Sequence, residues 1–354
     1  MLRIKEHDSE DGKPGRILEL SDVEFTPLGF SDLKDAKLSK PMTIPLQGHG
    51  TIVVKIGDEL PAQSGHFHTY LESHFTSKAI GLVRGGWLPS ALAVTNETIV
   101  LPDRCIVAQL KARMQNGIVR DNLEKDFIDL FADSPVRINP MLFVLEGDAR
   151  TNPTSNQALA QLNEAAAKLR AALPKAILVA ADRNGLEGVL GLIEESNRGM
   201  TRKEDFLLRL APSLMSPVGK RRLPSLWDEI VVAAKDYELP TSSLIVLAAM
   251  SSMLMPNGSS PAKGILKLHS GYTRADAYNA LADLRALEIL MCLFAIFPNQ
   301  KLMLCTADKD LALFWAGLDA SNFTIRERVV SANLTKANLF PGITDAQWHS
   351  LLSA

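Results

Sequence analysis

The stretch LMLCTADKDLALFW (residues 302–315) decides the fold prediction for this chain. It opens with an apolar run that ends at Thr306, and two acids, Asp308 and Asp310, follow almost at once. The spacing of the apolar residues after them is typical of a helix. In a parallel α/β sheet, functional groups gather where strands end. The stretch therefore predicts a buried strand that places carboxylates at the functional edge of such a sheet.

Two other apolar runs end in an acid in the same way. TIVLPD (98–103) ends in Asp103, and MLFVLE (141–146) ends in Glu146. Parallel strands of the same polarity would bring both acids to the edge that carries Asp308. Aspartate is also a favoured helix N-cap, so capping is the competing interpretation for each run taken alone.

A long helical pattern, residues 274–297, supplies a fourth acid. Asp276, Asn279 and Asp283 are spaced i, i+3 and i+7, so they share one face, and that face becomes apolar further along. Asp283 lies closest to the apolar part and is the best candidate to point into a site. The competing interpretation is a boundary residue paired with an arginine such as Arg274.

Four clustered carboxylates cannot all ionise in a dry pocket without compensation. Mg²⁺ or Mn²⁺ would compensate them, because hard divalent cations prefer oxygen ligands. Such a site suits phosphodiester hydrolysis, in which one ion activates a water and a second ion, about 3.5–4 Å away, stabilises the leaving oxygen.

In this order of strands, acids and helix, roughly residues 98–331 resemble the PIN domain superfamily, which contains many metal-dependent ribonucleases. The resemblance implies Mg²⁺ or Mn²⁺ ligands at Asp103, Asp283 and Asp308. It implies that Glu146 binds a second ion or acts as a base, and that Asp310 is a further ligand or orients the water. Thr306 stands at the threonine of the family, where its hydroxyl could bond a metal-bound water.

The chain departs from a compact PIN domain in one large respect. Glu146 and Asp283 are 137 residues apart (283 − 146), which predicts a helical insertion at about 151–265. The gap also leaves open other candidates for the second acid: Glu187, Glu194 and Glu195.

The expected fold is α/β, with a PIN-like parallel sheet flanked by helices. Residues 1–17 are charged and read as a flexible arm. Strand-like runs such as TIVVKIG (51–57) and AIGLVRGGWLP (79–89) predict a small β-rich accessory domain over residues 18–95. Residues 96–354 would form the PIN-like domain with its insertion.

The net charge of −2 gives no whole-molecule attraction to nucleic acid. A local patch or metal ions would have to hold a polyanion. The tight basic cluster GKRR (219–222), together with three downstream cations, could form a phosphate-binding wall. Its predicted members are Lys220, Arg221, Arg222, Lys263, Lys267 and Arg274. The spacing of His66, His68 and His74 is compatible with zinc, but an exposed hairpin is the favoured interpretation.

Three separated cysteines, a charged start without a signal-peptide core, and apolar runs too short to span a bilayer indicate a cytoplasmic protein without a membrane partner. We expect a metal-dependent endoribonuclease. The alternatives are a non-catalytic PIN-like scaffold or binding protein, and a DNA nuclease of a defence or repair system. A homodimer, or a partner protein bound through the N-terminal domain, is compatible with the extra module.

Overall fold

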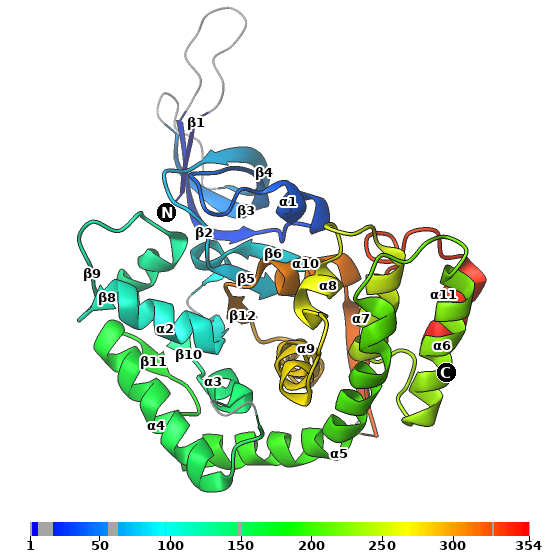
Figure 1. Cartoon of the computed structure of the whole chain (residues 1–354). Coiled ribbons are helices and arrows are strands. Elements are labelled where there is room, and N and C mark those ends of the chain that lie inside the picture. The colour runs from blue at the N-terminus through cyan, green and yellow to red at the C-terminus, as the bar shows by residue number, and fades with distance from the viewer. Residues whose placement is uncertain are drawn as a thin grey trace, which may run out of the picture.

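A six-stranded sheet lies at the centre of the molecule (Figure 1). The computed structural model describes residues 2–5, 17–55, 63–95, 97–147, 151–327 and 329–353. In spatial order the strands are β11 (Ile177–Leu178), β10 (Arg137–Ile138), β7 (Ile99–Pro102), β12 (Leu302–Thr306), β5 (Ile80–Val83) and β6 (Gly86–Pro89).

The first four of these strands are parallel, and β5 and β6 add an antiparallel edge. The chain runs outward from β7 to β10 and β11, then returns to the other side of β7 to form β12. The strand order therefore reverses between β7 and β12, and in open α/β sheets such a switch point is where ligands bind. Every residue of β7 and β12 is buried, as expected for strands covered on both faces.

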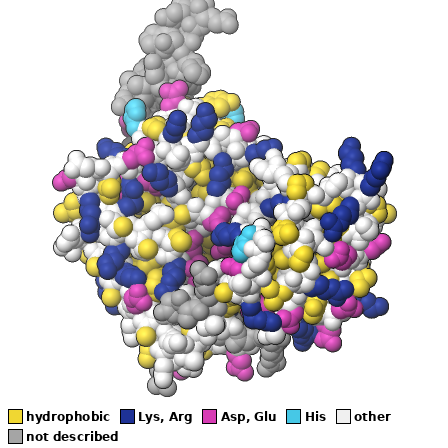
Figure 2. All heavy atoms as spheres, in the orientation of Figure 1, with side chains coloured by type: hydrophobic (Ala, Val, Ile, Leu, Met, Phe, Trp, Pro, Cys, Tyr) yellow, Lys and Arg dark blue, Asp and Glu magenta, His cyan; other side chains and the backbone are white. Residues whose placement is uncertain are grey.

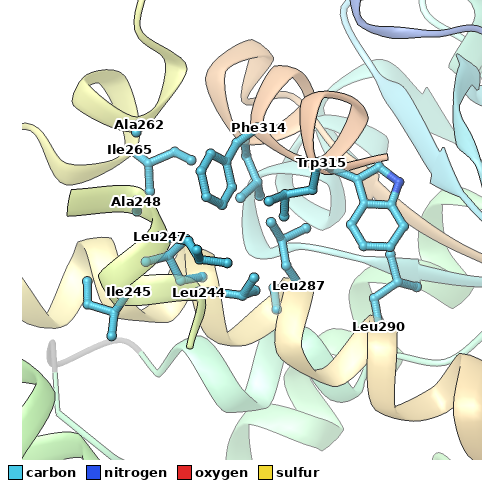
Figure 3. Close-up of a cluster of buried hydrophobic side chains, with 14 of the residues drawn as sticks. Leu244, Ile245, Leu247, Ala248, Ala262, Ile265, Leu287, Leu290, Phe314 and Trp315 are labelled. Atoms are coloured by element: carbon cyan, nitrogen blue, oxygen red, sulfur yellow. The ribbon is translucent and has the colours of Figure 1, made fainter. Parts of the chain in front are cut away.

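Helices cover the sheet and each other. Those that contact β7 or β12 are α2 (Arg104–Arg113), α3 (Met141–Glu146), α9 (Arg274–Ile296) and α10 (Lys309–Leu318). Helix α4 (Ser155–Ala172) packs on α2 and α3. Two further helices, α7 (Leu244–Leu254) and α8 (Pro261–Leu266), pack with α9 and α10 around a shared apolar cluster (Figure 3). In that cluster Leu287 of α9 lies among residues of α7 and Phe314 of α10. Ten residues of α7, Leu244–Met253, are all buried, so this helix belongs to the interior rather than the surface.

The predicted insertion is largely helical. The runs LEGVLGLIEES (186–196) and KEDFLLRLA (203–211), which each have a helical pattern in the sequence, belong to one long helix, α5 (Arg183–Leu214). It contacts α4, α6 (Leu223–Asp236), α7 and α9. The insertion also contains β11, which pairs with β10 at the edge of the central sheet. The expected last helix is α11 (Asp345–Ser353). No helix in the described part of the chain is long and apolar enough to cross a bilayer.

A second, four-stranded antiparallel sheet lies at the N-terminal end (Figure 1). Its strands, in order, are β1 (Leu2–Lys5), β2 (Ile17–Phe25), β3 (Thr43–Lys55) and β4 (Gln63–Glu72), and α1 (Phe30–Asp35) connects β2 to β3. Backbone bonds between Leu28 and Trp87 join this module to β6. The Trp87 Nε1–H also donates to the Gly29 carbonyl at 2.9 Å.

The two sheets do not follow the predicted division of the N-terminal region into an arm (1–17) and a β-rich domain (18–95). The 80–89 hairpin belongs to the central sheet, because β5 pairs with β12, so it is not part of the predicted β-rich domain. Residues 2–5 of the predicted arm form β1, and residues 6–16 lie outside the described residues, as do residues 56–57 of TIVVKIG.

Two predictions of secondary structure are wrong. MLFVLE is the helix α3 rather than a strand, because Pro140 begins a helix and the Asn139 Oδ1 accepts from the Met141 N–H at 3.0 Å. Met141–Leu145 are all buried, so the run is apolar on every side and its periodicity could not reveal a helix. The run FTIRERVV (323–330), which the sequence suggests as a strand, is a hairpin of β13 (Ser321–Arg326) and β14 (Val329–Asn333), turned at Glu327 with a φ of 49°.

Substitution of Gly86 tests how closely the chain packs at the junction between the two sheets. Gly86 has a φ of 148°, and a Cβ there would collide with the Leu28 carbonyl oxygen. We expect Gly86→Ala to lower the free energy of unfolding by roughly 2–3 kcal/mol, through backbone strain and this collision. Chemical denaturation measures the change. The matched control is Gly85→Ala, since Gly85 also has a positive φ of 82° but open space around it, and an equal loss in both variants would contradict the expectation.

Candidate functional site

Asp103 and Asp308 lie at the carboxyl ends of two adjacent parallel strands. Asp103 follows β7 and caps α2, and its Oδ1 accepts from the Ile106 N–H at 2.7 Å. Asp308 follows β12 and caps α10, and its Oδ1 accepts from the N–H groups of Asp310 at 2.8 Å and Leu311 at 3.0 Å. Both interpretations therefore hold together, because each aspartate caps a helix and also lies at the carboxyl end of a strand of the sheet.

Thr306 links these two acids. It is fully buried at the end of β12, and its Oγ1 accepts from the Asp308 N–H at 3.0 Å. Its side chain also hydrogen-bonds the Asp103 carboxyl group. Thr306 therefore fixes the position of one acid relative to the other, and its burial favours this role over direct contact with a water in the pocket.

Glu146, at the end of α3, approaches the same edge. Its Oε2 accepts from the Arg104 N–H at 3.2 Å. Burial, reinforced by the charges of Asp103 and Asp283, raises the pKa of Glu146 to about 8. Of the alternatives that the sequence left open, Glu187 and Glu194 are exposed on α5, and the side chain of Glu195 lies outside the described residues.

Asp283 of α9 completes the acidic group. Its Oδ2 lies 3.8 Å from the Lys267 Nζ, and the same ammonium group is 3.9 Å from the Asp308 Oδ2. The competing prediction of a pair between Asp283 and Arg274 is wrong, because Arg274 pairs with Glu204 and Asp205.

Asp276 and Asn279 were predicted to share the helix face of Asp283, and only one of them lies at the site. Asp276 accepts from the Thr273 N–H and hydroxyl, and so belongs to the box that caps α9. Asn279 lies in the pocket with Asp283. Of the three polar residues predicted on this face of α9, only Asn279 and Asp283 therefore line the site.

The acids influence one another electrostatically. Burial raises the pKa of Asp103 to about 6, and the charge of Asp308 adds to the shift. Burial raises the pKa of Asp283 to about 7, with Asp308 and Asp103 adding to it and Lys267 opposing it. Burial and Asp308 also raise the pKa of Asp310. These acids come from distant segments and still form one cluster with an excess of negative charge.

An open pocket of about 540 Å³ adjoins the cluster. It is lined by Arg104, Glu146, Gly147, Lys267, Asn279, Ala282 and Asp283. Figure 2 shows acidic side chains gathered near the middle of one face, with Lys or Arg and His side chains beside them. Arg104 was missed by the sequence reasoning, although its place directly after Asp103 could have suggested it.

Asp310 lies at the back of the cluster, in the first turn of α10. It packs against α8 so closely that a Cβ on Gly264 would collide with its carboxyl group. This contact brings α8, and with it Lys267 at the end of α8, to the acids. Lys267 has a left-handed backbone with a φ of 49°, a conformation that usually favours glycine.

The predicted basic wall does not form as a unit. Of its six members, only Lys267 lines the acidic pocket. Lys263 donates to Asn257, and Arg222 caps α6 and donates to Ser213. Lys220 and Arg221 precede α6, which lies beyond α7 as seen from α9 (Figure 1), and neither residue lines the acidic pocket.

Whether the site fits a metal ion depends on the type and the positions of its acidic side chains. Across the described ranges, no three Asp, Glu, His or Cys side chains stand in positions that would hold a metal ion. The predicted acids nevertheless offer oxygen donors only, and one cation, the Lys267 ammonium group, already lies between two of them. This chemistry suits Mg²⁺ or Mn²⁺, provided that Lys267 moves away and the carboxylates close in.

Comparison with known proteins gives no independent assignment. No family model, curated protein sequence or solved structure matches the chain. Membership of the PIN superfamily therefore stays a prediction, and function has to be inferred from the geometry of the site.

The raised pKa values make stability depend on pH. For Asp283 the folded-state pKa of about 7 exceeds the usual value near 4, so the folded protein holds a proton that the unfolded chain releases. Asp283→Asn should therefore gain stability relative to the original protein as pH rises from about 4 to 7. A shift of about three pKa units corresponds to a gain of at most about 4 kcal/mol, and the gain should level off above pH 7. Chemical denaturation in EDTA at pH 5, 6.5 and 8 measures this.

The control for this prediction is Asp345→Asn. Lys336 holds the pKa of Asp345 below its usual value, so its titration ends below pH 5 and its effect should stay constant over the same range. A stability difference for Asp283→Asn that stays flat or shrinks with rising pH would contradict the described electrostatics.

Proposed function

We propose that this protein is a metal-dependent endoribonuclease that hydrolyses RNA phosphodiester bonds. The observation that carries the proposal is the convergence of four acids at the switch point of the sheet. They are Asp103, Glu146, Asp283 and Asp308, and the first and last cap helices at the ends of adjacent strands. A bound Mg²⁺ or Mn²⁺ would supply charge neutralisation and water activation at this place.

The residues of the chain divide into rigid and adjustable groups. Asp103 and Asp308 are fixed by their caps and by Thr306, so each carboxyl group is held in a defined place. Asp283 and Glu146 approach from α9 and the end of α3, with fewer bonds to the backbone. We assign the rigid pair to orienting the ion, and the adjustable pair to closing around it, with Glu146 at a second ion or as a base. Asp310, packed on α8, would be a further ligand or orient the attacking water.

Arg104 is suited to hold the phosphate group that is cleaved. It lines the pocket, and its guanidinium group lies 4.3 Å from the centre of the Phe143 ring. Its Nη1 donates to the Phe143 carbonyl oxygen at 3.2 Å, which leaves other N–H groups for a ligand. A planar guanidinium fixed by stacking is an effective partner for phosphate oxygens.

A second candidate function is a non-catalytic scaffold or binding protein. The observation that favours it is Lys267, which already brings a positive charge to Asp283 and Asp308. A permanent Lys267 contact would let the protein keep its acids without a metal ion. We favour the nuclease because Lys267 is 60% exposed and its ammonium group is 3.8–3.9 Å from the acids, so it is loosely held.

The nuclease assay uses single-stranded RNA and single-stranded DNA of the same sequence, with Mg²⁺ or Mn²⁺ and with EDTA. We expect cleavage of RNA that EDTA abolishes and that Asp308→Asn lowers by at least about 100-fold, because a fixed ligand is lost. The control is Asp319→Asn at the other end of α10, where Asp319 is exposed and asparagine tolerates the left-handed backbone.

The outcomes separate the candidates. Cleavage of DNA in preference to RNA would make the protein a DNA nuclease. Absence of metal-dependent cleavage by both the original protein and Asp308→Asn would favour the scaffold.

Lys267→Met tests whether the lysine competes with a metal ion. Removing a charge about 4 Å from two acids should tighten Mn²⁺ binding by roughly threefold to tenfold, since the ion no longer displaces it. Calorimetric titration measures the affinity, independently of any cleavage. The control is Lys263→Met, because the Lys263 ammonium group of the original protein donates to Asn257 outside the pocket. Unchanged or weaker Mn²⁺ binding by Lys267→Met would show that the lysine does not occupy the place of the ion.

A further inference from the structure

A second pocket, of about 550 Å³, lies on the other side of the N-terminus of α10. Its side chains include four lysines, and its lining reaches the acids through Ala307, the residue between Thr306 and Asp308. The residues that matter here are Lys37, Lys40, Lys78, Gln109, Ala307 and Lys309. We call this the lysine pocket.

Two of these lysines come from the N-terminal module. Lys37 and Lys40 lie in the connection from α1 to β3, in a turn closed by a bond from the Lys40 N–H to the Lys37 carbonyl oxygen at 3.0 Å. Both side chains are exposed. Within the residues that the structure describes, neither ammonium group has a carboxylate partner, so both charges face the solvent.

The other two lysines are already engaged. The Lys309 Nζ donates to the carbonyl oxygens of Lys34 at 3.2 Å and Ala36 at 2.8 Å, which attaches the α1–β3 connection to α10. Lys78 pairs with Glu124 at 2.9 Å, and the charge of Asp35 lies near Lys309. The pocket is therefore held in place by Lys309, and its free charge comes mainly from Lys37 and Lys40.

Helix α2 contributes Arg104 to the acidic pocket and Gln109 to the lysine pocket, and the exposed side chains between them in the chain are small. On α2, Cys105 and Ala108 are exposed, and Gln109 after them lines the lysine pocket. Cys105 is close enough to the cluster that the charges of Asp103 and Glu146 act on its thiol. No bulky group of α2 therefore separates the two pockets, and an extended ligand could lie across this helix and reach both.

We propose that the lysine pocket binds backbone phosphates of a single-stranded nucleic acid whose cleaved phosphodiester lies at the acidic pocket. This inference rests on the proposed nuclease function and gives the N-terminal module a role in holding the substrate. Charge complementarity carries it: the whole chain has a net charge of −2, yet four lysines gather next to an acidic site. A single strand fits because its backbone can bend from one pocket into the other.

The test measures binding separately from cleavage. In the Asp308→Asn background, fluorescence anisotropy follows a labelled single-stranded RNA with and without the double change Lys37→Glu/Lys40→Glu. We expect affinity to fall at least tenfold. The slope of log affinity against log salt should become shallower by about 1.4, or about 0.7 for each lost phosphate contact.

The matched control carries the same change of charge elsewhere. Lys175 and Lys235 are exposed; Lys175 lies just before β11, at the opposite edge of the sheet, and Lys235 lies in the last turn of α6. Lys175→Glu/Lys235→Glu should leave both the affinity and the salt slope close to those of the background protein. An equal loss in this control would overturn the proposal, because it would reveal a general effect of net charge.

Cleavage by the otherwise unchanged protein distinguishes the two proposals. If it cleaves RNA, Lys37→Glu/Lys40→Glu should raise KM with kcat nearly unchanged, and an unchanged KM would overturn the lysine pocket while the nuclease stands. If the protein binds RNA through these lysines and never cleaves it, the nuclease proposal fails and the lysine pocket stands. Absence of any RNA binding at low salt would overturn the lysine pocket directly. Circular dichroism and melting curves of every variant exclude unfolding as the cause.

Discussion

The parallel pairing of β7 with β12 is the constraint on which the rest of the structure depends. The register places Pro102 opposite Cys305, and the Asp103 N–H donates to the Cys305 carbonyl oxygen at 3.0 Å. This brings two segments that are about 200 residues apart in the chain to a common edge, and the buried Thr306 hydroxyl then links both acids. If this register shifted by one residue, Asp103 and Thr306 would point to opposite faces and the cluster would not form.

The acidic site lowers the stability of the folded protein at neutral pH. Asp103, Glu146 and Asp283 are held in surroundings that raise their pKa values, so at neutral pH part of the folding free energy opposes their ionisation. Lys267 reaches two of the acids from a left-handed backbone position. Proteins tend to tolerate such burdens at places where a ligand compensates for them, and the surrounding apolar cluster of α7, α8, α9 and α10 supplies the stability that the acids remove (Figure 3).

The N-terminal module contacts the central sheet and its helices at several places, and two of these connections lead to the site. Trp87 and Leu28 connect it to β6, and Lys309 connects its α1–β3 segment to the first turn of α10. The second connection begins one residue after Asp308, so the module meets the rim of the site. Trp315 of α10 in turn donates to the carbonyl oxygens of Val83 and Gly86, both at 3.0 Å. Helix α10 thus links the module, the β5–β6 hairpin and the acids in one rigid unit.

The sequence by itself determined the elements that depend on local patterns. The buried strands before Asp103 and Asp308, and the long helix that carries Asp283, follow from apolar runs, capping residues and periodicity, which are read over a few neighbours. The tertiary structure alone decided whether MLFVLE was helix or strand, which sheet received the 80–89 hairpin, and which lysines lie near the acids. A run that is buried on all sides has no informative periodicity, and neither hairpin membership nor the placement of a surface charge is encoded by near neighbours. Both depend on pairing between distant segments, and for this reason Lys37 and Lys40 line the pocket beside Ala307 while the more conspicuous cluster at 220–222 does not.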